Sequence, residues 1–214
     1  YDKTDTQIAA GIGGAPAASH TSIIVPVPGD ETLYYIFTNE AVNGGSSNMV
    51  RYSLFDLKQN GGLGAIVQQS QPLFARSTER ITASGRWLII HEEGNNSFRA
   101  YPITATGIGN PVITAIGSDH ATSPLENNEG YMKLGPNNTI AVALSTPGVS
   151  NFIELFTLVD SSGVLINYRK IDLKEPNGQV YGVEFSPGGN KVFATINKSL
   201  GSSYLFEYFI DSIG

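Results

Sequence analysis

The sequence contains no cysteine and few charged side chains. The absence of cysteine excludes a disulfide framework, a zinc ribbon and a thiol nucleophile. Charged residues make up 15% of the 214 residues, and the net charge is −6. Such a chain lacks the basic stripe that nucleic-acid binding requires. No apolar run approaches the length of about 20 residues that a membrane-spanning helix needs. We therefore expect no nucleic-acid partner and no membrane insertion.

Glycine, proline and aromatic residues are plentiful instead. The chain has 24 glycines, 11 prolines, 10 tyrosines and 10 phenylalanines. Aromatic residues favour strands, whereas glycine and proline favour tight turns. In residues 181–193 (YGVEFSPGGNKVF), Tyr181, Val183 and Phe185 alternate with other residue types before a Ser-Pro-Gly-Gly-Asn segment, and Val192 begins a second run. This pattern predicts a strand, a tight turn and another strand.

The same order of elements recurs along the chain at a spacing of roughly fifty residues. A clear second copy of the hairpin lies at residues 130–142, and weaker copies lie at residues 80–90 and 22–37. A third strand is expected after each hairpin, at residues 49–55, 98–103, 152–158 and 204–210. Four antiparallel strands in about fifty residues are typical of a β-propeller blade, which buries its faces against neighbouring blades.

The sequence therefore predicts an all-β protein, a single β-propeller domain built from four-stranded antiparallel blades. We expect four blades, with residues 1–21 as the remainder of a preceding blade. The blades are placed at residues 22–74, 75–120, 126–175 and 178–214. A β-sandwich with accidentally similar hairpins is the alternative, but the recurring order of strand, turn and third strand favours the propeller.

Both ends of the sequence fall inside the predicted repeat. Residues 211–214 match the turn at residues 160–163 that leads to a fourth strand, and no first or second strand precedes residues 1–4. We therefore expect a fragment of a larger, seven-bladed propeller, with the rest of that propeller as a partner. Alternatively, residues 6–10 supply an outer strand and close a four-bladed ring. An open stack would expose apolar faces and strand edges, which soluble proteins avoid.

Several motifs occur in an order that resembles one family of WD-like or YVTN-like repeats. They are residues 22–29 (SIIVPVPG), 34–38 (YYIFT), 61–64 (GGLG), 105–107 (ATG) and 181–187 (YGVEFSP). The order resembles the N-terminal propeller of large Bacteroidetes surface proteins that are exported by type IX secretion and associated with gliding motility. The resemblance covers nearly the whole chain, although the turns at residues 136–138 and 187–189 lack the usual Asp-Gly. It implies an extracellular or cell-surface location and supplies no catalytic residues.

Few residues carry recognisable chemistry, and we predict no catalytic residue, no metal site and no cofactor. The three histidines lack the HxH or HExxH spacing of a metal site, and no G-x-S-x-G nucleophile elbow is present. Connectors on one face of a propeller, and tyrosines on its strands, are nevertheless candidates for binding a ligand. The residues predicted to do so are His91, Glu92, Asp119, His120, Tyr131 and Tyr181.

Two functions fit these observations. The first is a non-enzymatic module of a secreted or cell-surface protein, used for adhesion or for protein or glycan interaction. Ser212, in the sequence Asp-Ser-Ile, fits an O-glycosylation pattern associated with Bacteroidetes. The second function, kept as the alternative, is a propeller lactonase or hydrolase that uses a mouth formed by His91, Glu92 and His120. Such enzymes also carry G-V-x-F-S-P-x-G hairpins, so residues 181–193 do not distinguish the two functions.

Overall fold

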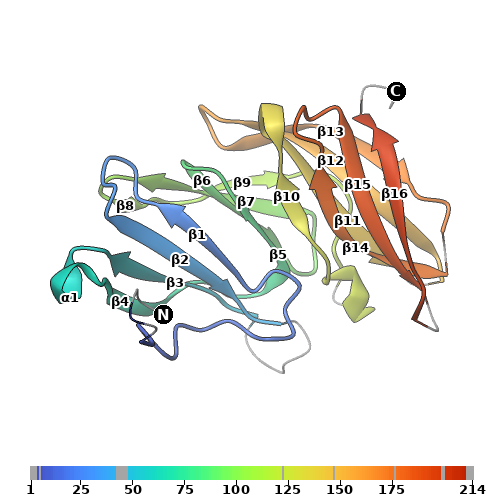
Figure 1. Ribbon diagram of the computed structural model, residues 1–214. Helices are drawn as coiled ribbons and strands as arrows, with labels where there is room; N and C mark the ends of the chain where they lie inside the picture. The colour runs from blue at the N-terminus through green and yellow to red at the C-terminus, as the bar shows by residue number, and fades with distance from the viewer. Residues whose placement is uncertain are drawn as a thin grey trace.

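The chain folds into four antiparallel sheets that follow one another along the sequence, from blue to red in Figure 1. The computed structural model describes residues 4, 6–41, 48–121, 123–146, 148–175, 177–198 and 201–210. The predicted all-β propeller architecture, with antiparallel blades, is confirmed. Within the described part of the chain, no helix is long and apolar enough to span a membrane.

The sheets are named 1 to 4 in chain order. Sheet 1 contains β1 (Ser22–Pro26), β2 (Leu33–Asn39), β3 (Val50–Asp56) and β4 (Ala65–Phe74), with the short helix α1 (Gln59–Gly62) before β4. Sheet 2 contains β5 (Ser77–Ala83), β6 (Trp87–Glu92), β7 (Ser97–Thr104), β8 (Gly107–Ile108) and β9 (Val112–Ala115). Both β8 and β9 pair with β7.

Sheet 3 contains β10 (Met132–Leu134), β11 (Thr139–Thr146), β12 (Ser150–Val159) and β13 (Val164–Asp172). The 3-10 helices η1 (Leu125–Asn127) and η2 (Pro136–Asn138) precede β10 and β11. Sheet 4 contains β14 (Gly178–Phe185), β15 (Lys191–Lys198) and β16 (Ser203–Phe209), so it has three strands within the described residues. The first strands lie side by side, because β5 contacts both β1 and β10, and β10 contacts β14. We call this line of first strands the inner edge.

The hairpin at residues 181–193 forms as its sequence predicts. Phe185 pairs with Val192 across β14 and β15. The Ser186 N–H donates to the Lys191 carbonyl at 3.0 Å, and the Gly189 N–H donates to the Ser186 carbonyl at 2.9 Å. Gly189 has a φ of 70°, a conformation that most residues avoid. The turn is therefore scaffold, and its glycine is required by backbone geometry.

Three apolar clusters join the four sheets, one at each contact between neighbours. The first joins sheets 1 and 2 through side chains such as Phe37 and Leu88. The second joins sheets 2 and 3, and includes Ile89 and Phe156. The third, which includes Val180, joins sheets 3 and 4. Since each cluster takes residues from two sheets, no sheet completes its core alone.

Strand β6 belongs to a sheet with a neighbour on each face, and its apolar residues follow one another without alternation. Leu88 and Ile90 pack against sheet 1, whereas Trp87 and Ile89 pack against sheet 3. Leu88, Ile89 and Ile90 are completely buried. A strand covered on both faces needs apolar residues at successive positions.

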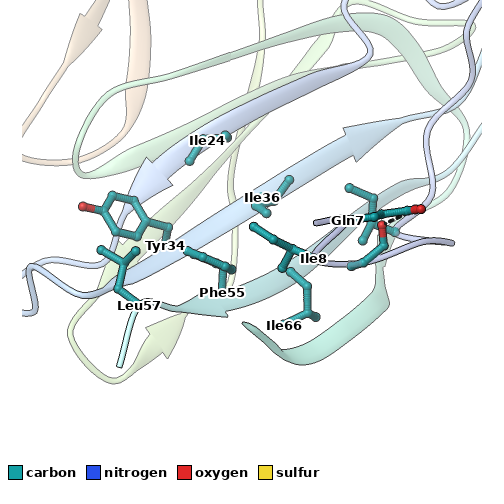
Figure 2. A pocket seen from close by; sticks show the side chains of 10 residues that line it. Gln7, Ile8, Ile24, Tyr34, Ile36, Phe55, Leu57 and Ile66 are labelled. Carbon is teal, nitrogen blue, oxygen red and sulfur yellow. Dashed lines mark hydrogen bonds between the residues drawn. The ribbon is translucent and has the colours of Figure 1, made fainter. Parts of the chain in front are cut away.

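The segment before β1 crosses one face of sheet 1. The Gln69 side chain donates to the Ala10 carbonyl at 2.7 Å, and Thr38 Oγ1 donates to the Ile12 carbonyl at 3.1 Å. Figure 2 shows Ile8 pointing toward Phe55 and neighbouring apolar side chains of this face. A cavity of about 590 Å³ remains there. The segment thus covers part of the face that sheet 2 leaves free.

Truncation of Leu88 tests the role of the contact between sheets 1 and 2. Leu88→Ala is expected to lower the free energy of unfolding by about 2–5 kcal/mol, because it leaves a cavity in a closed cluster. Ile113→Ala, at a position that is 54% exposed on β9, should change it by about 0.5 kcal/mol or less. Urea unfolding of the two variants measures the difference, and equal losses would contradict the assignment.

Candidate functional site

The structure brings His91 and His120 together, although they come from different segments. His91 lies on β6, and His120 lies in the connector between sheets 2 and 3. Their rings stack with centroids 3.5 Å apart at an interplanar angle of 16°. Both side chains are completely buried. The pair therefore belongs to the interior between the two sheets.

Two buried charges flank His120. Arg80 Nη1 lies 3.4 Å from His120 Nδ1, and Glu154 Oε2 lies 3.5 Å from His120 Nε2. Glu154 Oε1 also accepts hydrogen bonds from the Ser118 N–H at 3.0 Å and the Tyr168 hydroxyl at 2.9 Å. A guanidinium and a carboxylate are thus buried at opposite ends of one imidazole, where each compensates the charge of the other.

Burial fixes the protonation states in this network. It lowers the pKa of His91 well below the usual value, and the neighbouring His120 and Arg80 lower it further. Burial and the Arg80 charge also lower the pKa of His120 well below the usual value. The pKa of Arg80 is lowered by burial to about 10, a shift that Glu154 opposes. At neutral pH both imidazoles are therefore uncharged and the guanidinium is charged.

Glu92 and Asp119 do not join this pair. Glu92 Oε1 forms an ion pair with Arg99 Nε at 2.6 Å, and Glu92 Oε2 accepts a hydrogen bond from Asn95 Nδ2 at 2.8 Å. Asp119 is exposed. The mouth expected from His91, Glu92 and His120 is therefore closed in this structure, because the imidazoles are buried and the Glu92 carboxylate is bound to Arg99. Ser212 lies outside the described residues.

Tyr131 and Tyr181 meet at the inner edge. Their rings make an edge contact with centroids 5.9 Å apart, and the Tyr131 N–H donates to the Tyr181 carbonyl at 2.8 Å. His20 stacks on Tyr131 with centroids 5.3 Å apart. His20 is not among the residues that the sequence predicts to bind a ligand. Its position directly before a first strand is the signal that could have found it.

Ser19 and Glu79 hold His20 in place. The Ser19 N–H and hydroxyl both donate to Glu79 Oε2 at 2.6 Å. Ser19 Oγ accepts a hydrogen bond from the Gly130 N–H at 2.8 Å. Gly130 has a φ of 108°, which a residue with a side chain rarely adopts. These bonds join the segment before β1 to β5 and to the backbone next to Tyr131.

The imidazole of His20 is partly buried and has a lowered pKa. Burial lowers its pKa, the charge of Lys133 lowers it further, and a hydrogen bond to the Ile81 backbone opposes both effects. Nδ1 is shielded from solvent and has no hydrogen-bond partner among the described residues. At neutral pH the His20 ring is therefore uncharged.

A small cavity on sheet 4 adjoins Tyr131. It has a volume of about 190 Å³, and its lining includes Tyr131, Lys133, Glu184 and Thr195. Lys133 Nζ pairs with Glu184 Oε2 at 2.7 Å, and both side chains are partly exposed. An ammonium has three donors, so Lys133 retains donors beyond the one Glu184 takes. Tyr131 thus contacts the His20 ring and also lines the cavity that contains Lys133.

A metal site is not apparent in the part of the chain that the structure describes. Within it, no group of three or more metal-ligating side chains comes together.

No protein-family model and no curated protein matches the chain. Solved structures do resemble it. One is a putative 6-phosphogluconolactonase from Bacteroides uniformis, with 15% identity and a TM-score of 0.55 over 96% of this chain and 61% of that one. Another is a putative 6-phosphogluconolactonase from Bacteroides fragilis, with 16% identity and a TM-score of 0.54 over 86% of this chain and 50% of that one. At such identity the likeness establishes a shared fold alone. The chain spans about half to three-fifths of the length of these two proteins.

The comparisons correct the first functional prediction. A non-enzymatic adhesion or interaction module is contradicted, because both of these structures are described as putative lactonases. Adhesion was inferred from a family resemblance and from the lack of familiar catalytic motifs. The lack of a local motif does not exclude an enzyme, because the residues of an active site can come from separate segments of the chain.

The buried histidine pair makes the protein sensitive to acid. His91 and His120 have lowered pKa values in the folded state and ordinary values near 6.5 when unfolded. The unfolded state therefore binds more protons as the pH falls below about 6.5, and stability falls by up to about 1.4 kcal/mol per pH unit for each histidine. Urea unfolding between pH 7.5 and pH 5 should show this loss. His91→Phe keeps a flat ring, and its stability should depend less steeply on pH. An unchanged slope would contradict the assignment.

Proposed function

We propose that the protein hydrolyses a small sugar lactone, with the site at the inner edge around His20, Tyr131 and Lys133. The observation that carries the proposal is the arrangement of His20, a partly exposed and neutral imidazole that stacks on Tyr131 and feels the charge of Lys133. The fold likeness to two putative 6-phosphogluconolactonases supports the choice of lactones as the substrate class.

The reaction requires a base and a group that stabilises negative charge. The neutral imidazole of His20, which is partly exposed, takes a proton from a water molecule as the water oxygen attacks the lactone carbonyl carbon. The carbonyl oxygen becomes an oxyanion, and the Lys133 ammonium stabilises it. The tetrahedral intermediate then collapses, and the bond between the carbonyl carbon and the ring oxygen breaks. The imidazolium returns its proton to the departing ring oxygen, so the product is a hydroxy acid.

Tyr131 gives the site its geometry. Its ring stacks on His20 and also lines the cavity beside Lys133. An imidazole that is stacked on one side and hydrogen-bonded to Ile81 has little rotational freedom, which favours a fixed direction for proton transfer. Tyr181 packs against the edge of Tyr131 and restricts that ring in turn.

Two substitutions and one matched control test the assignment in purified full-length protein. With glucono-δ-lactone and its 6-phosphate as probes, kcat/KM of His20→Gln should fall by about 10²-fold or more, as for loss of a general base. Lys133→Met should cost a similar factor, because one stabilising charge is lost. Lys198→Met removes a comparable ion pair with Glu175 on sheet 4 and should leave kcat/KM within about twofold. Acid release in a pH-stat measures all three. Absence of hydrolysis of either probe, or equal losses in all variants, would refute the proposal.

The pH profile tests the protonation state. Since burial and Lys133 lower the pKa of His20, the base stays unprotonated to a lower pH than a free histidine. The acid limb of kcat/KM should therefore have its midpoint below about 6.5. Lys133→Met removes one cause of the lowered pKa, so this midpoint should move upward in that variant. A midpoint that stays fixed or moves down would contradict the role of Lys133.

A further inference from the structure

Arg80 on β5 is completely buried, and its guanidinium binds the backbone that leads to Tyr131. Nη1 donates to the Asn127 carbonyl at 2.9 Å. Nη2 donates to the carbonyls of Glu129 and, at 2.6 Å, of Ala143. Nε also donates to the Ala143 carbonyl at 2.9 Å. One side chain of sheet 2 thus holds three carbonyls of the connector to sheet 3 and of sheet 3 itself.

Other segments also form hydrogen bonds with the backbone of residues 127–131. The Glu79 N–H donates to the Asn128 carbonyl at 3.0 Å, and the Ala143 N–H donates to the Tyr131 carbonyl at 3.0 Å. Gly130 donates to Ser19, the neighbour of His20. Residues 127–131 are therefore fixed between β5, β11 and the segment before β1.

We propose that Arg80 is a positioning residue of the inner-edge site, and that it sets the place of the Tyr131 ring against His20. It acts by fixing the Asn127 and Glu129 carbonyls, on the segment that delivers Tyr131. The inference rests on the proposed function for its catalytic consequence, but the ring contact can be measured without activity.

Arginine is suited to this task because its guanidinium is planar and has five donors that point in fixed directions. It serves carbonyls at residues 127, 129 and 143 at the same time. A lysine would keep the charge but carries its donors on one atom. The carbonyls left without a donor would be buried and unsatisfied, which favours a shift of the connector.

The histidine pair and Glu154 brace the guanidinium from the opposite side. His120 contacts Nη1, and Glu154 contacts the far nitrogen of His120. The neutral imidazole therefore separates two buried charges, and it limits the movement of Arg80 away from the connector. This gives the buried His120 a role that does not require access to solvent.

Arg80→Lys in the purified full-length protein tests the proposal. The chain has only three histidines, so NMR of histidine-labelled protein resolves His20. The ring of Tyr131 should shift the resonances of the His20 ring protons. Tyr131→Leu removes this ring-current shift, so the resonances of that variant show how large the shift is. In Arg80→Lys the His20 resonances should move toward those of Tyr131→Leu, and kcat should fall by about tenfold or more with KM changed much less.

A matched control separates positioning from general destabilisation. Ile89→Ala weakens the same contact between sheets 2 and 3 without touching the carbonyls. It should lower the melting temperature but leave the His20 resonances in place. If Arg80→Lys also leaves them in place, the positioning role is refuted.

Two further outcomes remain decisive. If Arg80→Lys does not fold, His120→Asn, which removes the brace at Nη1, should shift the His20 resonances in the same direction by a smaller amount. No shift in that variant would overturn the proposal. If the wild-type protein hydrolyses neither lactone, the proposed function fails, but the NMR comparison still decides whether Arg80 places Tyr131 against His20.

Discussion

Sheets 2 and 3 of this protein each contribute side chains to two apolar clusters, and sheets 1 and 4 each contribute to one, so no sheet buries its apolar residues by itself. Contact between neighbouring sheets is therefore the constraint on which the rest of the structure depends. The three apolar clusters each combine residues of two successive sheets. Stacking also brings the first strands side by side. The inner edge, with its polar groups, is a consequence of that packing.

Hydrogen bonds of buried polar side chains also connect the sheets. Unlike apolar packing, each of these bonds joins two particular atoms. Arg80 reaches from sheet 2 to carbonyls that lead into sheet 3, and Glu79 at the next position binds Ser19. Successive strand residues point to opposite sides. The Arg80 side chain therefore enters the interior between sheets 2 and 3, and the Glu79 side chain binds the segment before β1. Two adjacent residues of β5 thus link the buried network to the inner-edge site.

The residues of the proposed site form no familiar motif. His20, Tyr131 and Lys133 lie far apart in the sequence, and none of them belongs to a short catalytic pattern. Of the residues predicted to bind a ligand, Tyr131 and Tyr181 meet at the inner edge, and His91 and His120 meet in the interior. The cell-surface location and the type IX secretion implied by the family resemblance stay predictions, since no feature of the described residues bears on them.

The sequence by itself determined the repeat and its strands. Alternating apolar residues around Pro-Gly-Gly at residues 187–189 specify a hairpin locally, and the run Trp87–Ile90 indicates a strand buried on both faces. Only the tertiary structure decided which polar residues meet and which are buried. His91 and His20 look alike in sequence, yet His91 is completely buried between two sheets, whereas His20 is partly exposed and stacks on Tyr131 at the inner edge. Hydrogen bonding and burial depend on contacts between segments sixty or more residues apart, such as Ser19 with Glu79, and no local pattern encodes such contacts.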